Sequence, residues 1–273
     1  MSNKLPDVQE NEKPNFNIPI KFVGIENFKL PFKLKLRDSD ELIDLIAKTE
    51  ILTNVSANKK GISMSRLLLS IQPFLNDGLC WETLKKCLDN TADLVVSDSV
   101  NIKMSFDLPI IKKSPLSDHE FPVYYPCSFE GYKDYDIYNF YQSVNVQYSS
   151  YCPCSAALAK ELSQPGFPHA QRSFAEIVTK MDLNNKKQIW LEDIIDLVLN
   201  NIKTQPYPII KRIDEQEISK IASENPLFVE DAIRIISNEL NKMDSLIDWS
   251  IKCVHEESIH NHNAIAINWK YGM

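Results

Sequence analysis

The sequence brings two kinds of potential metal ligand close together. Cys152 and Cys154 are separated by one proline, and His169 follows a stretch that contains proline and glycine. Thiolate and imidazole groups are the usual first ligands of zinc and similar cations. Two cysteines at this spacing also fit an interpretation in which both are small core residues. His169 lies in an expected loop, where an apolar packing role is less natural, so the pattern favours a metal site.

A second cluster combines histidines with carboxylates. His255, Glu256, Glu257, His260 and His262 lie within eight residues and include three of the five histidines of the chain. Neighbouring Glu and His side chains are the usual means of moving protons near neutral pH. The other interpretation is a polar surface turn between two closing strands, and the sequence alone leaves both open.

Charged residues form a third cluster further along the chain. Glu215 and Glu230 fit ordinary solvated helix charges, and Lys211 and Arg212 fit surface charges that could meet phosphates. Residues 225–226, an Asn followed by a Pro, predict a helix start with Asn as the cap and Pro in the first position.

A fourth cluster precedes the first expected helix pair. Ser65 is expected to cap that helix, and Arg66 together with the lysines at 59 and 60 would place cations near its start. This arrangement could bind phosphate, although a capped loop without a ligand is the more common outcome. The chain has neither a GxxxxGK[ST] loop nor a GxGxxG motif, so a P-loop or dinucleotide fold is not supported.

The elements that must position these residues follow a repeated order. Alternating apolar and polar residues predict strands at 18–26, 28–37, 100–111, 121–132, 138–148, 172–183, 247–254 and 264–271. Helical spacing predicts helices at 65–76, 81–90, 190–202, 215–223 and 226–243. Each half therefore has two strands, two helices and two strands. This order predicts an α+β fold with antiparallel sheets and helices on one face.

Composition limits the class of protein. The chain has 273 residues, of which 44% are hydrophobic and 25% charged, as in a soluble globular protein, and its net charge of −7 argues against nucleic acid as a partner. We expect no secretory signal and no membrane association, because the start is polar and no apolar stretch is long enough for a span. A cytoplasmic location follows, where cysteines are more often ligands or nucleophiles than disulfides.

Taken together, the clusters resemble the type IB GTP cyclohydrolases over nearly the whole chain. No single motif identifies the family, but the number of matching stretches and their order along the chain do. The matching stretches are LPDVQ (5–9), VGI (23–25), Pro31, GISMSR (61–66), CPCS (152–155), HAQRS (169–173), WLED (190–193), KRIDE (211–215), ENPLFVED (224–231) and ESIHNHN (257–263).

The resemblance implies a tunnelling fold built from two fused ββααββ units. On this view residues 1–16 are a flexible tail, residues 17–135 form the first unit, and residues 136–273 form the second, which carries most of the active site. It also implies a homotetramer whose units pair through their sheets around a tunnel, with active sites at the interfaces between subunits.

The resemblance also assigns roles to individual residues. Cys152, His169 and Glu215 are expected to bind a divalent metal, zinc, manganese or iron, with Cys152 also counted among the catalytic residues. Glu230 would anchor the guanine edge, and Glu257 and His260 would transfer protons. The candidates for holding the triphosphate are Arg66, Arg172, Lys211 and Arg212.

The implied reaction is that of GTP cyclohydrolase I, the first step of tetrahydrofolate biosynthesis. The guanine imidazole ring of GTP would be opened by hydrolysis to give 7,8-dihydroneopterin triphosphate and formate. Two alternatives are an NADPH-dependent nitrile reductase of the same superfamily and a non-catalytic protein with a closed structural zinc site.

Two departures from the family pattern stand out. Ser63 occupies a position where the family often has His, and the segment between Cys154 and His169 is longer than expected. A loop can absorb extra residues without moving the ligands. The sequence assigns no role to Cys154 or His262.

Overall fold

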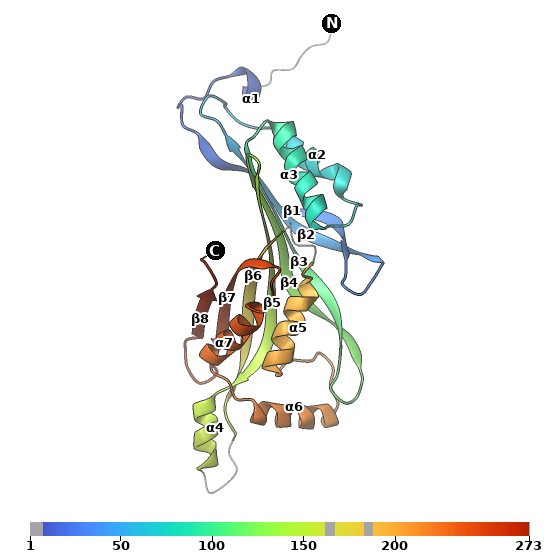
Figure 1. Cartoon of the computed structure of the whole chain (residues 1–273), viewed down its shortest axis with the longest axis vertical. Helices are drawn as coiled ribbons and strands as arrows, with labels where there is room; N and C mark the ends of the chain where they lie inside the picture. Colours follow the sequence, from blue (N-terminus) through green and yellow to red (C-terminus); the bar gives the residue numbers. More distant parts are fainter. Residues whose placement is uncertain (1–7, 162–166, 183–187, 273) are drawn as a thin grey trace. The chain divides into compact units, whose positions relative to one another are not determined.

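A computed structural model describes residues 8–161, 167–182 and 188–272. Its strands form one sheet, in which they follow one another in sequence order (Figure 1). Every strand pair whose register is described is antiparallel. The strands are β1 (Ile20–Lys35), β2 (Leu42–Val55), β3 (Ser99–Lys113), β4 (Glu120–Asp134), β5 (Ile137–Tyr151), β6 (Ala170–Met181), β7 (Leu246–Glu256) and β8 (Ala264–Trp269).

Helices interrupt the strands at corresponding places in the two halves. They are α1 (Val8–Asn11), α2 (Met64–Ile71), a 3-10 turn η1 (Gln72–Phe74), α3 (Trp81–Val95), α4 (Pro153–Lys160), α5 (Leu191–Ile202), α6 (Arg212–Glu224) and α7 (Val229–Leu240). The first half reads β1-β2-α2-α3-β3-β4. The second reads β5-β6-α5-α7-β7-β8, with α4 and α6 added. The predicted α+β class and its tandem ββααββ order are confirmed.

The first strand differs from the prediction. Residues 18–26 and 28–37, expected to be two strands, are parts of the single strand β1. The position between them is a bulge, because Asn27 has a φ of 61° and the pairing with β2 shifts its register there. A bulge interrupts the alternation of side chains along a strand, which explains why the sequence looked like two elements.

The true partner of β1 is β2, which the sequence analysis missed. Thr49 and Thr53 are buried in β2, whereas Ile46 is 64% exposed. Hydrophobic alternation therefore does not mark the buried face of this strand, and alternation is the signal on which strand prediction depends.

Two predicted helix caps are also wrong. Helix α2 begins at Met64 with Ser63 as the residue before it, so Ser65 lies inside the first turn. Asn225 ends α6 instead of starting α7, and its side-chain Nδ2 donates to the carbonyl of Ile221 at 2.7 Å. The following proline cannot continue a helix, and proline is common just after a helix end. Asn-Pro is thus a stop signal here, and α7 starts three residues later.

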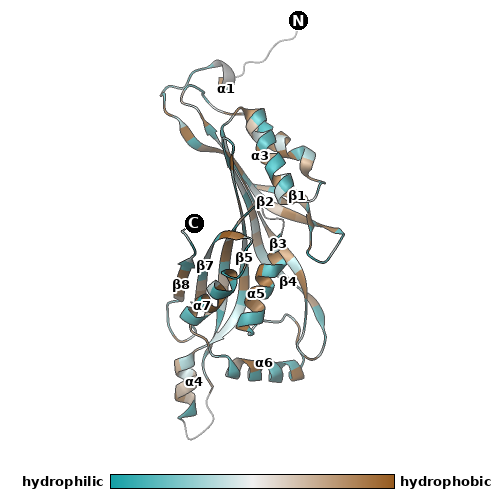
Figure 2. Ribbon diagram, viewed as in Figure 1, coloured by the Kyte–Doolittle hydropathy of each residue, from teal (hydrophilic) through white to brown (hydrophobic). Residues whose placement is uncertain are grey.

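Contacts divide the chain into two compact units, one of residues 1–106 with 128–141 and one of residues 107–127 with 142–273. In the second unit α5 and α7 pack on the sheet and bury apolar side chains against it, among them Ile195, Ile236 and Trp249. Figure 2 shows hydrophilic and hydrophobic residues along both helices, as expected for amphipathic elements. The division predicted at residue 135 from the sequence repeat remains a prediction.

Some predictions fall partly outside the described residues. They concern the first seven residues of the expected tail, residues 162–166 of the segment between Cys154 and His169, and the last residue of the strand predicted at 172–183. Within the described part of the tail, α1 forms one helical turn and Glu12 pairs with Lys60. No helix among the described residues has the length and apolar character to span a membrane.

Asp214 fixes the start of α6. Its buried carboxylate accepts hydrogen bonds from the backbone N–H of Leu116, Ser117 and Lys211 and from the Ser117 hydroxyl. Burial alone would raise the pKa of Asp214, but these hydrogen bonds outweigh it and hold the pKa below its usual range. The carboxylate therefore stays ionised and ties α6 to the turn between β3 and β4.

We expect Asp214→Ala to lower the melting temperature clearly, because it leaves several buried donors without a partner. The control is Asp231→Ala, which removes an exposed hydrogen bond from the backbone N–H of Phe228 at the start of α7 and an exposed ion pair with Arg234. The fall for Asp214→Ala should be at least about twice that of the control, measured by thermal unfolding. Equal shifts would contradict the role of Asp214 as a tie between elements.

Candidate active site

Cys152 lies at the junction between a strand and a helix. Strand β5 ends at Tyr151, and Cys152 is the cap residue of α4, whose first position is Pro153. Proline suits this position because its fixed φ is already helical. The backbone N–H of Ser155 points at Cys152 Sγ over 3.5 Å. The thiolate is the form of cysteine that binds metals, and Cys152 Sγ is placed at the start of a helix.

His169 is held against this junction by backbone contacts. The N–H of Cys152 donates to the carbonyl of His169 at 3.2 Å, and the N–H of His169 donates to Ser155 Oγ at 3.3 Å. Both the thiol and the imidazole are half-buried. His169 Nδ1 lies 3.5 Å from Ser258 Oγ. The segments that carry Cys152 and His169 and the turn after β7 therefore lie together at one corner of the second unit.

Glu257, the residue directly after β7, lies at the same corner. Strands β6 and β7 pair with Arg172 opposite Glu256, so the residues one step further along, Gln171 and Glu257, are also neighbours. Gln171 Nε2 donates to Glu257 Oε1 at 3.4 Å. Glu257 is half-buried, whereas His260 and His262 in the turn are exposed, with their rings stacked at a centroid distance of 5.2 Å. We refer to Cys152, His169 and Glu257 as the catalytic corner, after the roles that the sequence analysis predicted for them.

A buried polar network lies beside the catalytic corner. His255, only 1% exposed, has Tyr148 Oη 3.0 Å from Nε2 and Ser150 Oγ 3.1 Å from Nδ1. Ser150 in turn lies 2.8 Å from Ser173 Oγ. Burial lowers the pKa of His255 to about 4, against the opposing effect of the negative charge of Glu230. The imidazole is therefore neutral near pH 7, with one ring nitrogen donating and the other accepting.

Sequence reasoning missed most of this network. His255 was grouped with the surface turn, but it belongs to β7 and points into the protein. Tyr148 and Ser150 carried no motif, and Ser173 was given no role although it belongs to the matching stretch HAQRS. The available signal was their spacing, because 148 and 150 share one face of β5 with buried apolar residues.

Glu230 is the second residue of α7 and is exposed. Its charge opposes the lowering of the His255 pKa by burial, so the Glu230 carboxylate lies within electrostatic reach of the network beside the catalytic corner.

The remaining candidates lie at exposed positions or in the first unit. Glu215 lies in the first turn of α6 and is exposed, and among the described residues no three His, Cys, Asp or Glu side chains form a group that could hold a metal ion. Arg172 is exposed, on the face of β6 opposite to the buried Gln171. Lys211 and Arg212 are exposed at the start of α6. Arg66 belongs to the other unit.

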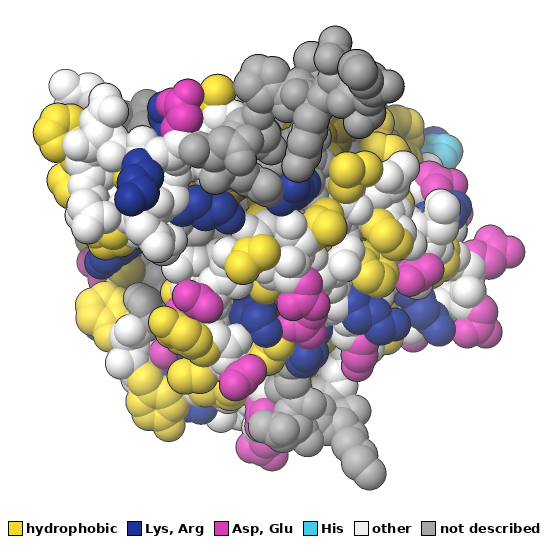
Figure 3. Space-filling model, turned by 90° about the horizontal axis from the view of Figure 1, so that it is seen from above, with side chains coloured by type: hydrophobic (Ala, Val, Ile, Leu, Met, Phe, Trp, Pro, Cys, Tyr) yellow, Lys and Arg dark blue, Asp and Glu magenta, His cyan; other side chains and the backbone are white. Residues whose placement is uncertain are grey.

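The charged surface is mixed where it can be seen. On the face shown in Figure 3, lysine and arginine side chains lie between aspartate and glutamate side chains. A continuous basic surface, which nucleic acid binding needs, is not seen on the visible part of this face.

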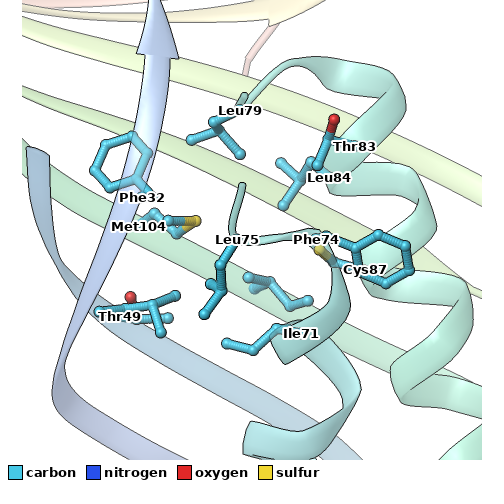
Figure 4. Close-up of a pocket in the computed structure, with 12 residues that line it drawn as sticks. Phe32, Thr49, Ile71, Phe74, Leu75, Leu79, Thr83, Leu84, Cys87 and Met104 are labelled. Carbon is cyan, nitrogen blue, oxygen red and sulfur yellow. The ribbon is translucent and has the colours of Figure 1, made fainter. Parts of the chain in front are cut away.

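The first unit has an apolar cavity that none of the candidate site residues lines. It is enclosed by β1, β2 and β3 on one side and by α2, η1 and α3 on the other, and Leu75, Leu84 and Met104 are among its lining residues (Figure 4). Its polar groups are few, namely Thr49, Thr83 and Cys87. Such a lining does not suit a nucleotide, because polar groups that fix orientation are needed in addition to apolar surface.

Comparisons with known proteins agree with the fold. The uricase from Arthrobacter globiformis has a TM-score of 0.59 at 6% sequence identity, covering 93% of this chain and 95% of that one. The class that the fold and the catalytic corner define is a tunnelling-fold protein with a thiol, an imidazole and a carboxylate at one end of its second unit.

The sequence comparisons identify the family within this class. The family model for type I GTP cyclohydrolase folE2 matches residues 5–266. GTP cyclohydrolase FolE2 of Cereibacter sphaeroides is 32% identical over 272 residues, covering 96% of this chain and 74% of that protein. GTP cyclohydrolase FolE2 of Dictyoglomus turgidum is 34% identical over 262 residues, covering 96% of both. The chain belongs to the type I GTP cyclohydrolase FolE2 family.

Proposed function

We propose that the protein opens the guanine imidazole ring of GTP by hydrolysis and releases formate and 7,8-dihydroneopterin triphosphate, the GTP cyclohydrolase I reaction at the start of tetrahydrofolate synthesis. The observation that carries the proposal is the catalytic corner, where contacts hold together the segments that carry a thiol, an imidazole and a carboxylate. The family relationship supports it and does not favour a nitrile reductase or a structural zinc protein.

The donor atoms of the corner suit a divalent metal. Cys152 and His169 supply sulfur and nitrogen, are half-buried rather than enclosed, and are held in place by backbone contacts. A zinc, manganese or iron ion bound there, with Glu215 as a third ligand, would supply the Lewis acidity that makes water nucleophilic near neutral pH. Three protein ligands leave a position open, as catalytic sites require.

The remaining roles follow from position and chemistry. The Glu230 carboxylate would accept two hydrogen bonds from the guanine ring N–H and exocyclic amine. Glu257 would orient His260, and His260 would give and take protons as the ring opens. Arg66, Arg172, Lys211 and Arg212 remain the candidates for binding the triphosphate, because each carries a cation.

The separation of Glu215 from the corner supports a site shared between subunits of a homotetramer. Strand β8 ends the sheet, and its Ile265, Ile267 and Trp269 are more than half exposed. An edge strand with exposed apolar side chains is a template for pairing with another chain. In such an assembly, Glu215 of the partner subunit would complete the ligand set of Cys152 and His169.

A shared site predicts complementation between two inactive variants. Cys152→Ala and Glu215→Ala should each be inactive alone. When the two chains are unfolded, mixed in equal amounts and refolded together, about a quarter of the sites should receive both native residues. We therefore expect about a quarter of wild-type formate release per site, and mixtures that stay inactive while forming normal oligomers would contradict the shared site.

The activity itself is tested by incubating the metal-loaded protein with GTP. We expect formate release together with the fluorescence of an oxidised pterin, and loss of both after chelation. A parallel incubation with a nitrile and NADPH should show no NADPH consumption. Turnover of the nitrile without formate from GTP would overturn the proposal.

A further inference from the structure

Gln171 is a buried polar residue that the proposed reaction does not yet use. It is the second residue of β6, is 7% exposed, and faces the same side of the sheet as Ser173. Its Nε2 donates to Glu257 Oε1 at 3.4 Å. Its Oε1 has no hydrogen-bond partner among the described residues. A buried acceptor without a partner is destabilising, so such a group calls for a reason other than stability.

A second buried glutamine shows what a structural role looks like. Gln142 in β5 is 2% exposed, and its Nε2 donates to the backbone carbonyl of Ile189 at 3.4 Å. The partner of Gln142 is thus an uncharged backbone group, as expected for a purely structural hydrogen bond. The partner of Gln171 is instead an ionisable side chain of the catalytic corner, half-buried and one residue beyond the end of β7.

We propose that Gln171 is a positioning residue that holds the Glu257 side chain in place in both of its protonation states. When Glu257 is a carboxylate, the Gln171 amide N–H donates to it, as the structure shows. When Glu257 has taken up a proton, the amide turns over by 180° and its oxygen accepts from the carboxylic acid. Because Oε1 has no partner to give up, no hydrogen bond of that atom opposes the turn.

The physical basis is that an amide carries a donor and an acceptor on one rigid group. Other side chains of similar size lack this property, since methionine has no donor and glutamate, when ionised, has only acceptors. A carboxyl group that exchanges protons needs a partner that remains satisfied before and after the exchange. The inference rests on the proposed function, because it assumes that Glu257 takes part in proton transfer.

The test is a double-mutant cycle between Gln171 and Glu257, with kcat and KM for GTP measured separately. We expect Gln171→Met to lower kcat about 10-fold or more with KM nearly unchanged, since it removes positioning but no contact with substrate. Glu257→Gln should lower kcat further. The double variant should have the same kcat as Glu257→Gln, because a residue that acts through the Glu257 carboxylate has no effect once that carboxylate is gone.

Gln142→Met is the matched control, with the same change of side chain at a buried position. It should lower the melting temperature at least as much as Gln171→Met but leave kcat unchanged. If Gln171→Met does not fold, Gln171→Glu keeps the shape without the amide donor and should lower kcat similarly. The inference would be overturned, without affecting the proposed function, if a folded Gln171 variant kept the wild-type kcat. The same holds if Gln171→Met lowered kcat by the same factor in the wild type and in Glu257→Gln. Wild-type kcat in Glu257→Gln would overturn the proposed proton-transfer role of Glu257 and the inference with it.

Discussion

Cys152→Ala is expected to abolish formate release from GTP. Cys152 caps α4 next to His169, where its thiolate would be the sulfur ligand of the metal. Loss of groups that only support a metal ligand commonly costs 10- to 100-fold in activity, so loss of the ligand itself should cost more than about 100-fold. Formate and pterin fluorescence are measured together with the metal content of the purified protein, which should fall in parallel.

Cys154→Ala is the control for this prediction. Cys154 is exposed and is two residues further into the same motif, in the first turn of α4. Its replacement by alanine should retain metal and most of the activity. If Cys154→Ala lost metal while Cys152→Ala kept it, the two cysteines would have been assigned the wrong way round.

The second large effect is on stability in acid. His255 is buried, and folding lowers its pKa from 6.5 to about 4. Between these pH values the imidazole is therefore protonated in the unfolded chain and neutral in the folded chain. The contribution of neutral His255 to the free energy of unfolding is therefore fully present above pH 6.5, and it is lost as the pH falls toward 4. One pKa unit corresponds to 1.36 kcal/mol, so the loss from this group at pH 4 is about 3 kcal/mol.

Urea unfolding at several pH values between 7 and 4 measures this dependence. His255→Gln removes the titrating group, so the free energy of unfolding should fall by about 3 kcal/mol less between pH 7 and pH 4 than in the wild type. The substitution also lowers stability at pH 7, because it disturbs the bonds to Tyr148 and Ser150. His119→Gln, at a half-buried position in the same unit, should leave the slope as in the wild type. An unchanged slope in His255→Gln would show that His255 is not buried in its neutral form.

Much of the fold could be predicted from the sequence because strand and helix periods are clear in the second half. The expected strand at 138–148 and helix at 190–202 agree with β5 and α5. The failures have local causes. In β2 the buried face carries threonines, and in β1 a bulge splits one strand into two apparent ones. Helix α4 was missed because it is only eight residues long and follows a cysteine motif that was considered for its chemistry alone.

The site was predictable to the extent that motifs carry it. Cys152, His169 and Glu257 were singled out from residue type and resemblance, and the structure brings their segments together. Gln171 and the partners of His255 were not singled out, because a polar residue at a buried strand position resembles an ordinary surface residue in the sequence. Glu215 shows a different limit, since the described residues of one chain do not group it with Cys152 and His169, and the sharing between subunits that we propose would not be visible in one chain.

The central claim is that Cys152 and His169 bind a divalent metal at the catalytic corner. Substitution with cobalt(II) tests it most directly, because a cobalt–thiolate bond gives a charge-transfer absorption that oxygen and nitrogen ligands do not. The account predicts this absorption in the wild-type protein and in Cys154→Ala, and its loss in Cys152→Ala. A charge-transfer band that persists in a folded Cys152→Ala variant would contradict the account.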